Sequence, residues 1–206
     1  MKATADRRQN LIGAAIALIR QRGFAGTSVD LICREAGVTK GAFFHYFRDK
    51  EEICEVAMQA WCDRWEESMA ALQQDEDRDA LDRLDDLFEL MLASYMRPET
   101  WQGGCLVGTV AQELSPSNPR LGSQCASHLE TWLDLTTPLL EKAKAQHKAH
   151  VDFHPSDVAL HMMTIVQGSL LVAKTLQNPE VIKNSVHHSR AYVNSLFFPA
   201  RKETQQ

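Results

Sequence analysis

The chain has 206 residues, of which 44% are hydrophobic and 24% charged, so it can bury a core and is not a low-complexity chain. Its five cysteines are odd in number and lack C-x-x-C spacing, which argues against a disulfide framework and a zinc knuckle. No apolar run approaches the roughly 18 residues of a membrane span, and the N-terminus lacks the apolar block of a signal peptide. We therefore expect a cytoplasmic protein with free thiols and no membrane partner.

Charge is divided unevenly along the chain. Residues 1–50 hold nine Lys and Arg against four Asp and Glu, a net charge of +5, whereas the remaining residues hold 13 against 23, a net charge of −10. A basic segment attracts a polyanion and an acidic one is repelled by it. The sequence therefore predicts one part that meets nucleic acid and one that does not.

Apolar residues recur three and four apart in almost every segment, which predicts an all-α protein of about nine helices. One face of the first helix is lined by Leu11, Ala15, Leu18 and Ile19. We expect Gly23 to end this helix in a left-handed conformation. Thr27 and Asp30 resemble a capping box that opens a second helix, which runs to Ala36.

A tight turn follows the second helix. Gly37 ends that helix, Val38 fills the corner, and Thr39 can cap a third short helix, so the two helices form a helix-turn-helix. Phe43 and Phe47 are four apart, and we expect both to face inward. The other residues of the third helix are then left on the outside.

The exposed side of the third helix has the chemistry of a helix that reads the major groove. Gly41 and Ala42 permit close approach to base edges, Phe44, His45 and Tyr46 would flank phosphates, and helix N-termini favour phosphate binding. Our candidate DNA-binding residues are Thr27, Ser28, Thr39, Lys40, Gly41, Ala42, Phe44, His45, Tyr46 and Lys50.

The rest of the chain continues as helices. Asp49 and Glu52 form a capping box before a long amphipathic helix, one face of which carries Cys54, Met58, Trp61, Trp65, Met69 and Leu72. We predict a linker at 73–79, a helix from 79 to 96 and another that begins after 103–104. A long helical segment then ends near 147 and is kinked at Pro138, one helix runs from Pro155 to 177, and a last helix begins at Pro179.

The stretch GFAGTSVDLICREAGVTKGAFFHYFRDKEEI, residues 23–53, resembles the N-terminal signature of the TetR family of bacterial transcription regulators. The matches include A-G-V-T at the turn, K-G in the third helix and H-Y-F at its end. Departures stand at Cys33 and Phe44, where the family often has Ala and Tyr. The resemblance implies a DNA-binding domain at 5–65 and a ligand-binding and dimerisation domain at 66–200.

The stretch GGCLVGTVAQELSPSNPRL, residues 103–121, is similar to family members that sense electrophiles through a cysteine placed as Cys105 is. Cys105 follows two glycines at a predicted helix start, where unpaired N–H groups favour a reactive thiolate. The alternative is that Cys105 is a small packing residue beside Leu106. The predicted ligand-binding residues are Trp61, Trp65, Phe88, Tyr95, Trp101, Cys105, Thr109, Glu113, His128, Met162 and Gln167, each of which could equally belong to the core or the surface. The histidines at 147, 150 and 154 lack a matching ligand pattern, so we expect no metal and no cofactor.

Residues 155–198 form the last two predicted helices and carry more apolar surface than one small layer can bury. In the TetR family the corresponding helices pair with the same two helices of a second copy. The alternative is that this surface belongs to the core of a monomer. We therefore predict a homodimeric repressor, cytoplasmic and associated with the bacterial nucleoid. A small apolar or electrophilic inducer would release it from a double-stranded, pseudo-palindromic operator. The alternative is a DNA-organising or partner-binding protein with no inducer. An enzyme is not expected, because no catalytic or phosphate-binding motif is present.

Overall fold

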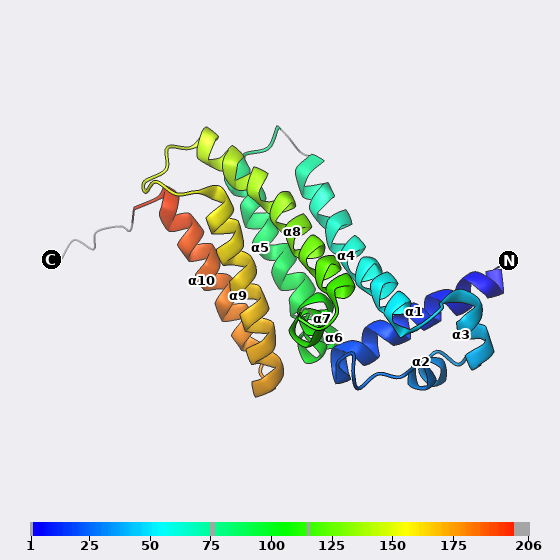
Figure 1. The fold of residues 1–206 in the computed structure, drawn as a ribbon. Helices are drawn as coiled ribbons and strands as arrows, with labels where there is room; N and C mark the ends of the chain where they lie inside the picture. The colour runs from blue at the N-terminus through cyan, green and yellow to red at the C-terminus, as the bar shows by residue number, and fades with distance from the viewer. Residues whose placement is uncertain (1, 75–76, 115, 200–206) are drawn as a thin grey trace. The chain divides into compact units, whose positions relative to one another are not determined.

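The computed structural model describes residues 2–74, 77–114 and 116–199. Helices account for most of this part of the chain, as Figure 1 shows, and the all-α prediction is confirmed. The N-terminal helices are α1 (Lys2–Arg22), α2 (Val29–Glu35), α3 (Lys40–Tyr46) and α4 (Lys50–Gln74). They are followed by α5 (Ala80–Tyr95), α6 (Pro98–Gly103), α7 (Leu106–Leu114), α8 (Pro119–Gln146), α9 (Pro155–Leu176) and α10 (Glu180–Phe197). The short helix α6 lies where the sequence predicted only a connection.

The helices form two compact units. The first comprises Met1–Glu67 and Glu99–Thr131, and the second comprises Ser68–Pro98 and Trp132–Gln206. Helices α4 and α8 each contribute to both units. By packing, therefore, α6, α7 and the start of α8 belong with the N-terminal helices, although they follow them by some 30 residues or more in the sequence.

The core of the first unit is built on α1. Leu11, Ala15 and Ile19 are fully buried, as their shared helix face predicted, and α7 adds Leu106 and Val110 to the same apolar cluster. Gly23 has a φ of 77°, so α1 ends in the predicted left-handed conformation. The helix-turn-helix and the segment after α5 thus share one core.

The cap of α2 differs from the prediction. Ser28 is the N-cap, and its hydroxyl accepts a hydrogen bond from the amide of Leu31 at 3.2 Å. Thr27 is instead fully buried, and its hydroxyl donates to the carbonyl oxygen of Gly23 at 2.7 Å. Thr27 therefore stabilises the loop after α1 and does not cap α2, because its hydroxyl is hydrogen-bonded to Gly23 in that loop.

One prediction that involves proline needs adjustment. Helix α8 contains Pro138 within one helical segment, and the kink expected there stays a prediction. Pro179 is the N-cap of α10 and not its first residue, whereas Pro155 does open α9 as predicted. Proline lacks a backbone N–H, so it is tolerated near a helix start, where that group has no partner within the helix.

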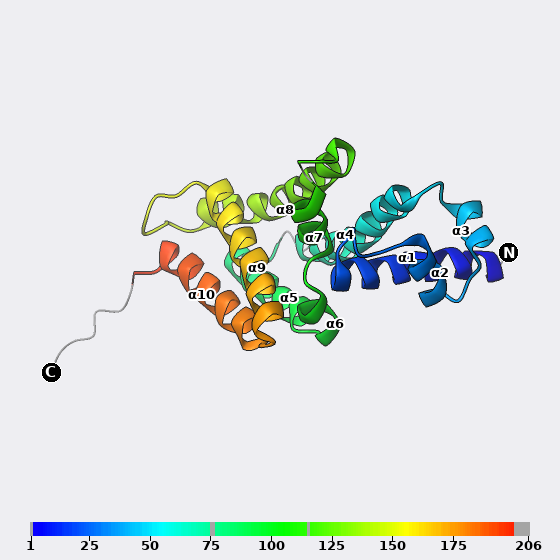
Figure 2. The ribbon, with the colours of Figure 1, turned by 60° about the horizontal axis from the view of Figure 1, so that its bottom comes forward.

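In the second unit, α9 packs along α10, and α10 also packs against α5; Figures 1 and 2 show this arrangement from two sides. The buried side of α9 consists of Val158, Ala159, Met162, Val166, Ser169, Leu170 and Ala173. The exposed large apolar residues of α9 and α10 are Leu160, Leu171, Val172, Leu176 and Tyr192. Helix α9 is therefore apolar on two sides, only one of which is covered.

Helix α9 is the one helix in the described part of the chain that is long and apolar enough to cross a membrane. Of its most apolar 18-residue window, 39% is buried. Because α9 packs along α10, which carries Lys183, His187 and Arg190, we interpret it as a core helix with one exposed apolar side.

Candidate nucleic-acid interface and signal-receiving residues

The turn between α2 and α3 is set by two residues. Gly37 has a φ of 66°, and the hydroxyl of Thr39 accepts a hydrogen bond from the amide of Ala42 at 3.2 Å, which caps α3. Phe43 and Phe47 are 0% and 2% exposed, and both belong to the core of the first unit. The inward-facing pair predicted from the sequence is thus confirmed, and it fixes which side of α3 faces outward.

The outward side of α3 has both charge and aromatic surface. Lys40, Gly41 and His45 are exposed, and Phe44 is 53% exposed although its ring contacts Phe43 edge to face. Ala42 and Tyr46 are half-buried. The ammonium group of Lys40 lies 3.0 Å from a carboxylate oxygen of Asp30 on α2, and both side chains are more than half exposed. This ion pair therefore remains open to competition by a phosphate.

Two candidate residues already have partners within the chain. Thr27 is buried, so its side chain is not available to nucleic acid in this structure. The ammonium group of Lys50 donates to the carbonyl oxygen of Phe24 at 2.8 Å and lies 4.0 Å from the centre of the Phe24 ring. Burial lowers the pKa of Lys50, and nearby Glu113 opposes the effect. Lys50 thus helps to hold the loop between α1 and α2.

The candidate DNA-binding residues do not include three exposed arginines of α1, α2 and the segment after α3. The side chain of Arg48 is 73% exposed and pairs with Glu52 four residues later. The guanidinium of Arg8 lies 5.5 Å from the centre of the Phe47 ring, and Arg34 is exposed at the end of α2. All three belong to the basic segment 1–50, so the uneven charge was the signal that could have found them.

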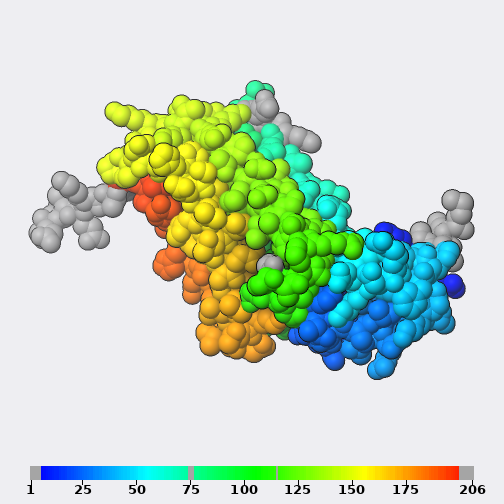
Figure 3. Space-filling view, viewed as in Figure 1, coloured from blue at the N-terminus to red at the C-terminus, as the bar shows by residue number. Residues whose placement is uncertain are grey.

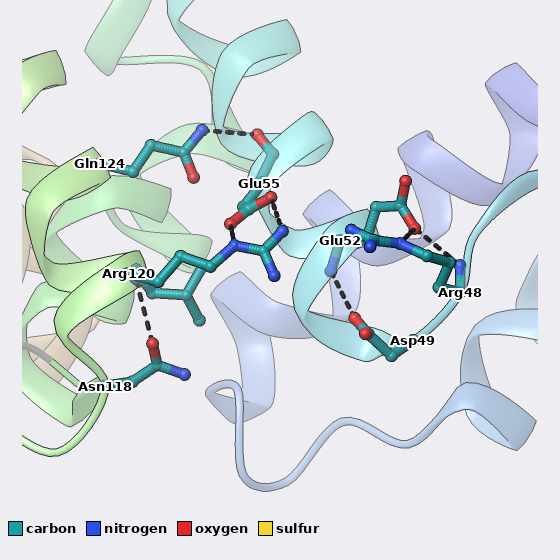
Figure 4. Close-up of polar contacts among 8 residues, drawn as sticks. Arg48, Asp49, Glu52, Glu55, Asn118, Arg120 and Gln124 are labelled. Atoms are coloured by element: carbon teal, nitrogen blue, oxygen red, sulfur yellow. Dashed lines mark hydrogen bonds and ion pairs between the residues drawn. The ribbon is translucent and has the colours of Figure 1, made fainter.

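The first turn of α4 is fastened on two sides, as Figure 4 shows. Asp49 accepts a hydrogen bond from the amide of Glu52 at 2.8 Å, which confirms the Asp49 half of the predicted capping box, whereas the carboxylate of Glu52 accepts one from the amide of Arg48 at 2.7 Å. On the other side, Arg120 pairs with Glu55, and the amide nitrogen of Gln124 donates to the carbonyl oxygen of Glu55 at 3.1 Å. The helix that follows the helix-turn-helix is therefore tied to the start of α8.

The predicted ligand-binding residues divide between the two units. The first unit contains Trp61, Trp65, Trp101, Cys105, Thr109, Glu113 and His128, and the second contains Phe88, Tyr95, Met162 and Gln167. In the second unit, Phe88 and Met162 are 1% exposed and serve as core. In the first, the carboxylate of Glu113 accepts a hydrogen bond from the amide of Ala25 at 2.9 Å, so Glu113 has a structural role.

Cys105 occupies the position just before α7. Its thiol accepts a hydrogen bond from the amide of Gly108 at 3.5 Å, and its carbonyl oxygen accepts one from the hydroxyl of Thr109 at 2.8 Å. It is half-buried, whereas Cys33, Cys54 and Cys125 are buried.

Three other cysteines of the first unit could compete with Cys105 for an electrophile, but their thiols are protonated at neutral pH. Burial raises the pKa of Cys54 to about 12, that of Cys62 to about 12 and that of Cys125 to about 11. A thiolate, not a thiol, is the nucleophile. At neutral pH these three cysteines therefore react slowly, and Cys62 is the one among them that is half-buried like Cys105.

His128 and Gln124, four residues apart on α8, have unused polar atoms. The Nε2 atom of His128 and the Oε1 atom of Gln124 are both buried and lack a hydrogen-bond partner in the described part of the protein. Burial lowers the pKa of His128, with Glu66 and Asp63 acting in the opposite direction, so the ring is neutral at pH 7. Buried polar atoms of this kind usually find a partner. A neutral ligand with a hydrogen-bond donor and an acceptor would supply a partner for each of these two atoms.

In the described residues, no group of three or more His, Cys, Asp or Glu side chains is arranged to hold a metal ion. Of the three histidines at 147, 150 and 154, His147 contacts a carboxylate, and its Nε2 atom lies 2.8 Å from Asp79. This contact joins the end of α8 to the N-cap of α5.

Comparison with protein families matches both parts of the chain. Residues 11–57 match the sequence profile described as "Bacterial regulatory proteins, tetR family". Residues 80–189 match the one described as "Tetracyclin repressor-like, C-terminal domain". The second match spans more than half of the chain and includes α5 to α9 and part of α10.

Individual relatives extend over most of the chain. The transcriptional regulator AcuR of Cereibacter sphaeroides is 29% identical over 172 residues, which cover 84% of this chain and 78% of AcuR. The repressor NemR of Escherichia coli K12 is 24% identical over 183 residues, or 89% of this chain and 92% of NemR. The crystal structure of a regulatory protein from Rhodobacter sphaeroides matches with a TM-score of 0.79 at 25% identity, covering 89% of this chain and 97% of that one.

Proposed function

Because the chain belongs to the TetR family of bacterial regulatory proteins, a family of ligand-responsive DNA-binding regulators, we propose that it is a homodimeric repressor that an inducer releases from a pseudo-palindromic operator. The observation that carries this proposal is the orientation of α3. Phe43 and Phe47 point into the core, so Lys40, Gly41 and His45 are presented together on the outside. This is the arrangement by which a recognition helix enters the major groove.

The contacts divide into two kinds. Gly41 and Ala42 have little side-chain bulk, so the start of α3 can come close to base edges and a methyl can meet a thymine methyl. Lys40, His45 and Tyr46, together with the arginine at 48, are placed to contact phosphates, which position the protein without reading sequence. Ser28 and Thr39 already cap helices, and their exposed hydroxyls add to this group.

Dimerisation through residues 155–198 is supported by the exposed apolar side of α9. Leu160, Leu171 and Leu176 are 48%, 51% and 63% exposed. A Cβ added at Gly168 would lie in open space, with no atom of another element within 4 Å. A second copy of α9 and α10 would cover this surface. Figure 3 shows atoms of α9, in yellow and orange, on the face toward the viewer. A dimer also presents two recognition helices, which is what a pseudo-palindrome requires.

The inducer is proposed to be small and either apolar or electrophilic. The unused polar atoms of His128 and Gln124 support a neutral ligand, and the half-buried thiol of Cys105 supports an electrophile. NemR, a relative over most of the chain, is named as a repressor. We further propose that the protein acts in the bacterial cytoplasm, at the nucleoid, and has no catalytic activity.

The test is a gel-shift and footprinting experiment with the full chain and the DNA upstream of its own gene. We expect a footprint of two half-sites centred about one helical turn, or a small multiple of it, apart. N-ethylmaleimide and neutral aromatic compounds would then be titrated to find the one that releases the DNA. Binding of equal strength to unrelated DNA, with no release by any compound, would instead identify a DNA-organising protein.

A further inference from the structure

Arg20 is a buried cation in the last turn of α1. Its side chain is 5% exposed, and burial lowers its pKa to about 10, so it is charged at neutral pH. Its Nε atom donates to the carbonyl oxygen of Gly104 at 2.8 Å, and its Nη2 atom donates to those of Glu99 and Thr100 at 2.6 and 2.9 Å. Its guanidinium carbon lies 4.1 Å from the centre of the Trp61 ring. We call this arrangement the Arg20 clasp.

The two glycines before Cys105 are explained by this clasp. A Cβ added at Gly103 would lie 2.9 Å from the guanidinium carbon of Arg20, closer than real Cβ atoms approach. Gly104 has a φ of 80°, a conformation that residues with side chains rarely adopt. The pair of glycines therefore provides room for the guanidinium and the backbone direction that the turn needs.

A second contact fastens the other end of the same segment. The carboxylate of Glu113, near the end of α7, accepts a hydrogen bond from the amide of Ala25 at 2.9 Å. Gly23 makes this possible, because a Cβ there would lie 1.8 Å from a carboxylate oxygen of Glu113. Residues 99–114 are thus attached both to the end of α1 and to the loop that leads into α2, and α7 packs beside α1, as Figure 2 shows.

The clasp is sensitive to small displacements. Taking a cation out of water is costly unless its hydrogen bonds are satisfied. These bonds weaken steeply when their distance or angle departs from the usual range. If the carbonyl oxygen of Gly104 moved away, the guanidinium would lose a partner while still buried, and an open arrangement with water around Arg20 would become favourable. Loss of one of these bonds would therefore favour full opening of the clasp over a buried guanidinium that is only partly bonded.

Cys105 is the residue next to this carbonyl. Its thiol and carbonyl groups bind Gly108 and Thr109, so bulk on the thiol competes with the contacts that hold the start of α7. We propose that the Arg20 clasp transmits a change at Cys105 to the helix-turn-helix. An adduct displaces the 103–105 turn, the clasp opens, and the end of α1 and the loop into α2 loosen.

This inference rests on the proposed function, because it takes the thiol of Cys105 as the receiver of the signal. The probe is N-ethylmaleimide. The thiolate sulfur adds to one alkene carbon, so a carbon–sulfur bond forms as the π bond breaks, and the proton lost by the thiol is balanced by one taken up at the other carbon. There is no leaving group, and no oxidant is required.

The experiment measures hydrogen exchange of the full chain by mass spectrometry before and after the reagent. All variants carry Cys62→Ser, which removes the other half-buried thiol, and intact mass reports a single adduct. Arg20→Lys keeps the charge but lacks the planar fork that reaches several carbonyls. Gly103→Ala keeps Arg20 and crowds the clasp. Arg22→Lys, an exposed cation in the same turn of α1, is the matched control.

We expect the adduct to raise exchange of the amides in residues 20–32 by about tenfold in the parent and in Arg22→Lys, because local opening exposes those hydrogen bonds. In Arg20→Lys and Gly103→Ala this exchange should already be fast, and the adduct should change it by less than about twofold. The inference is overturned if the parent's adduct leaves exchange at 20–32 unchanged, or if Arg20→Lys keeps the full response. Since this readout contains no DNA, a failure to bind an operator would count against the proposed function alone.

Discussion

The helix pairs α2–α3 and α9–α10 expose surfaces of opposite chemistry. Helices α2 and α3 bury Ile32 and Phe43 and leave Lys40, Arg34 and His45 in water. Helices α9 and α10 instead leave Leu171 and its apolar neighbours in water, although α9 also packs along α10. A charged surface suits a polyanion, whereas an exposed apolar surface of this kind marks a protein partner. The difference supports the proposal that the two pairs meet different partners.

The largest expected effect separates the buried from the exposed ring of α3. Phe43→Ala should lower the free energy of unfolding by about 3–5 kcal/mol, because it leaves a cavity in a fully buried position. Phe44→Ala, at the neighbouring but 53% exposed position, should cost less than about 1 kcal/mol. Urea denaturation followed by circular dichroism measures both. Equal losses would mean that α3 does not present one fixed side to DNA.

The next effect concerns the apolar surface of α9. Leu171→Glu should weaken the dimer about a hundredfold or more, because a carboxylate would be buried against the second copy without a partner. Sedimentation velocity over a range of concentrations measures the dissociation constant. Val151→Glu is the matched control, since Val151 is similarly exposed but lies before α9, outside the predicted interface. If Leu171→Glu remained a tight dimer, the interface would have to lie elsewhere.

A smaller effect is expected on the charged surface of α3. Lys40→Met should weaken binding to the operator and to unrelated DNA by a similar factor of about ten, and reduce the salt dependence by about one counterion per half-site. Fluorescence anisotropy at several salt concentrations measures this. A loss confined to one operator base pair would show that Lys40 reads a base and does not contact a phosphate.

The smallest effect has the opposite sign. Asp30→Asn removes the carboxylate that pairs with Lys40 at 3.0 Å, so the lysine becomes more available to DNA. Because exposed ion pairs are weak, we expect affinity for DNA to rise by about two- to fivefold with little change in stability. The same anisotropy assay detects the change, and Lys40→Met combined with Asp30→Asn should show much less of the gain. An unchanged affinity would place Lys40 outside the contact surface.

The helix-turn-helix could be read from the sequence because its determinants are local. Gly23 and Gly37 end helices through their own backbone conformation, and Thr39 caps α3 through a bond to a residue three positions on. The spacing of Phe43 and Phe47 then decides which side of α3 faces inward. Short-range geometry of this kind leaves a pattern in the sequence, so the prediction did not need knowledge of distant contacts.

Only the tertiary structure decided how residues 99–131 are used. The hydrogen bonds of Arg20 and Glu113 join residues about 80 or more positions apart. No periodicity records such contacts, so the sequence around Gly103 and Gly104 indicates a helix start and does not reveal the Arg20 clasp. The same limit applies to Lys50, whose carbonyl partner is 26 residues away, and to Thr27, whose burial depends on how the loop after α1 packs. The sequence determined helix ends that depend on local geometry, such as those at Gly23, Gly37 and Thr39, whereas long-range packing decided which polar side chains remain free to act on a partner.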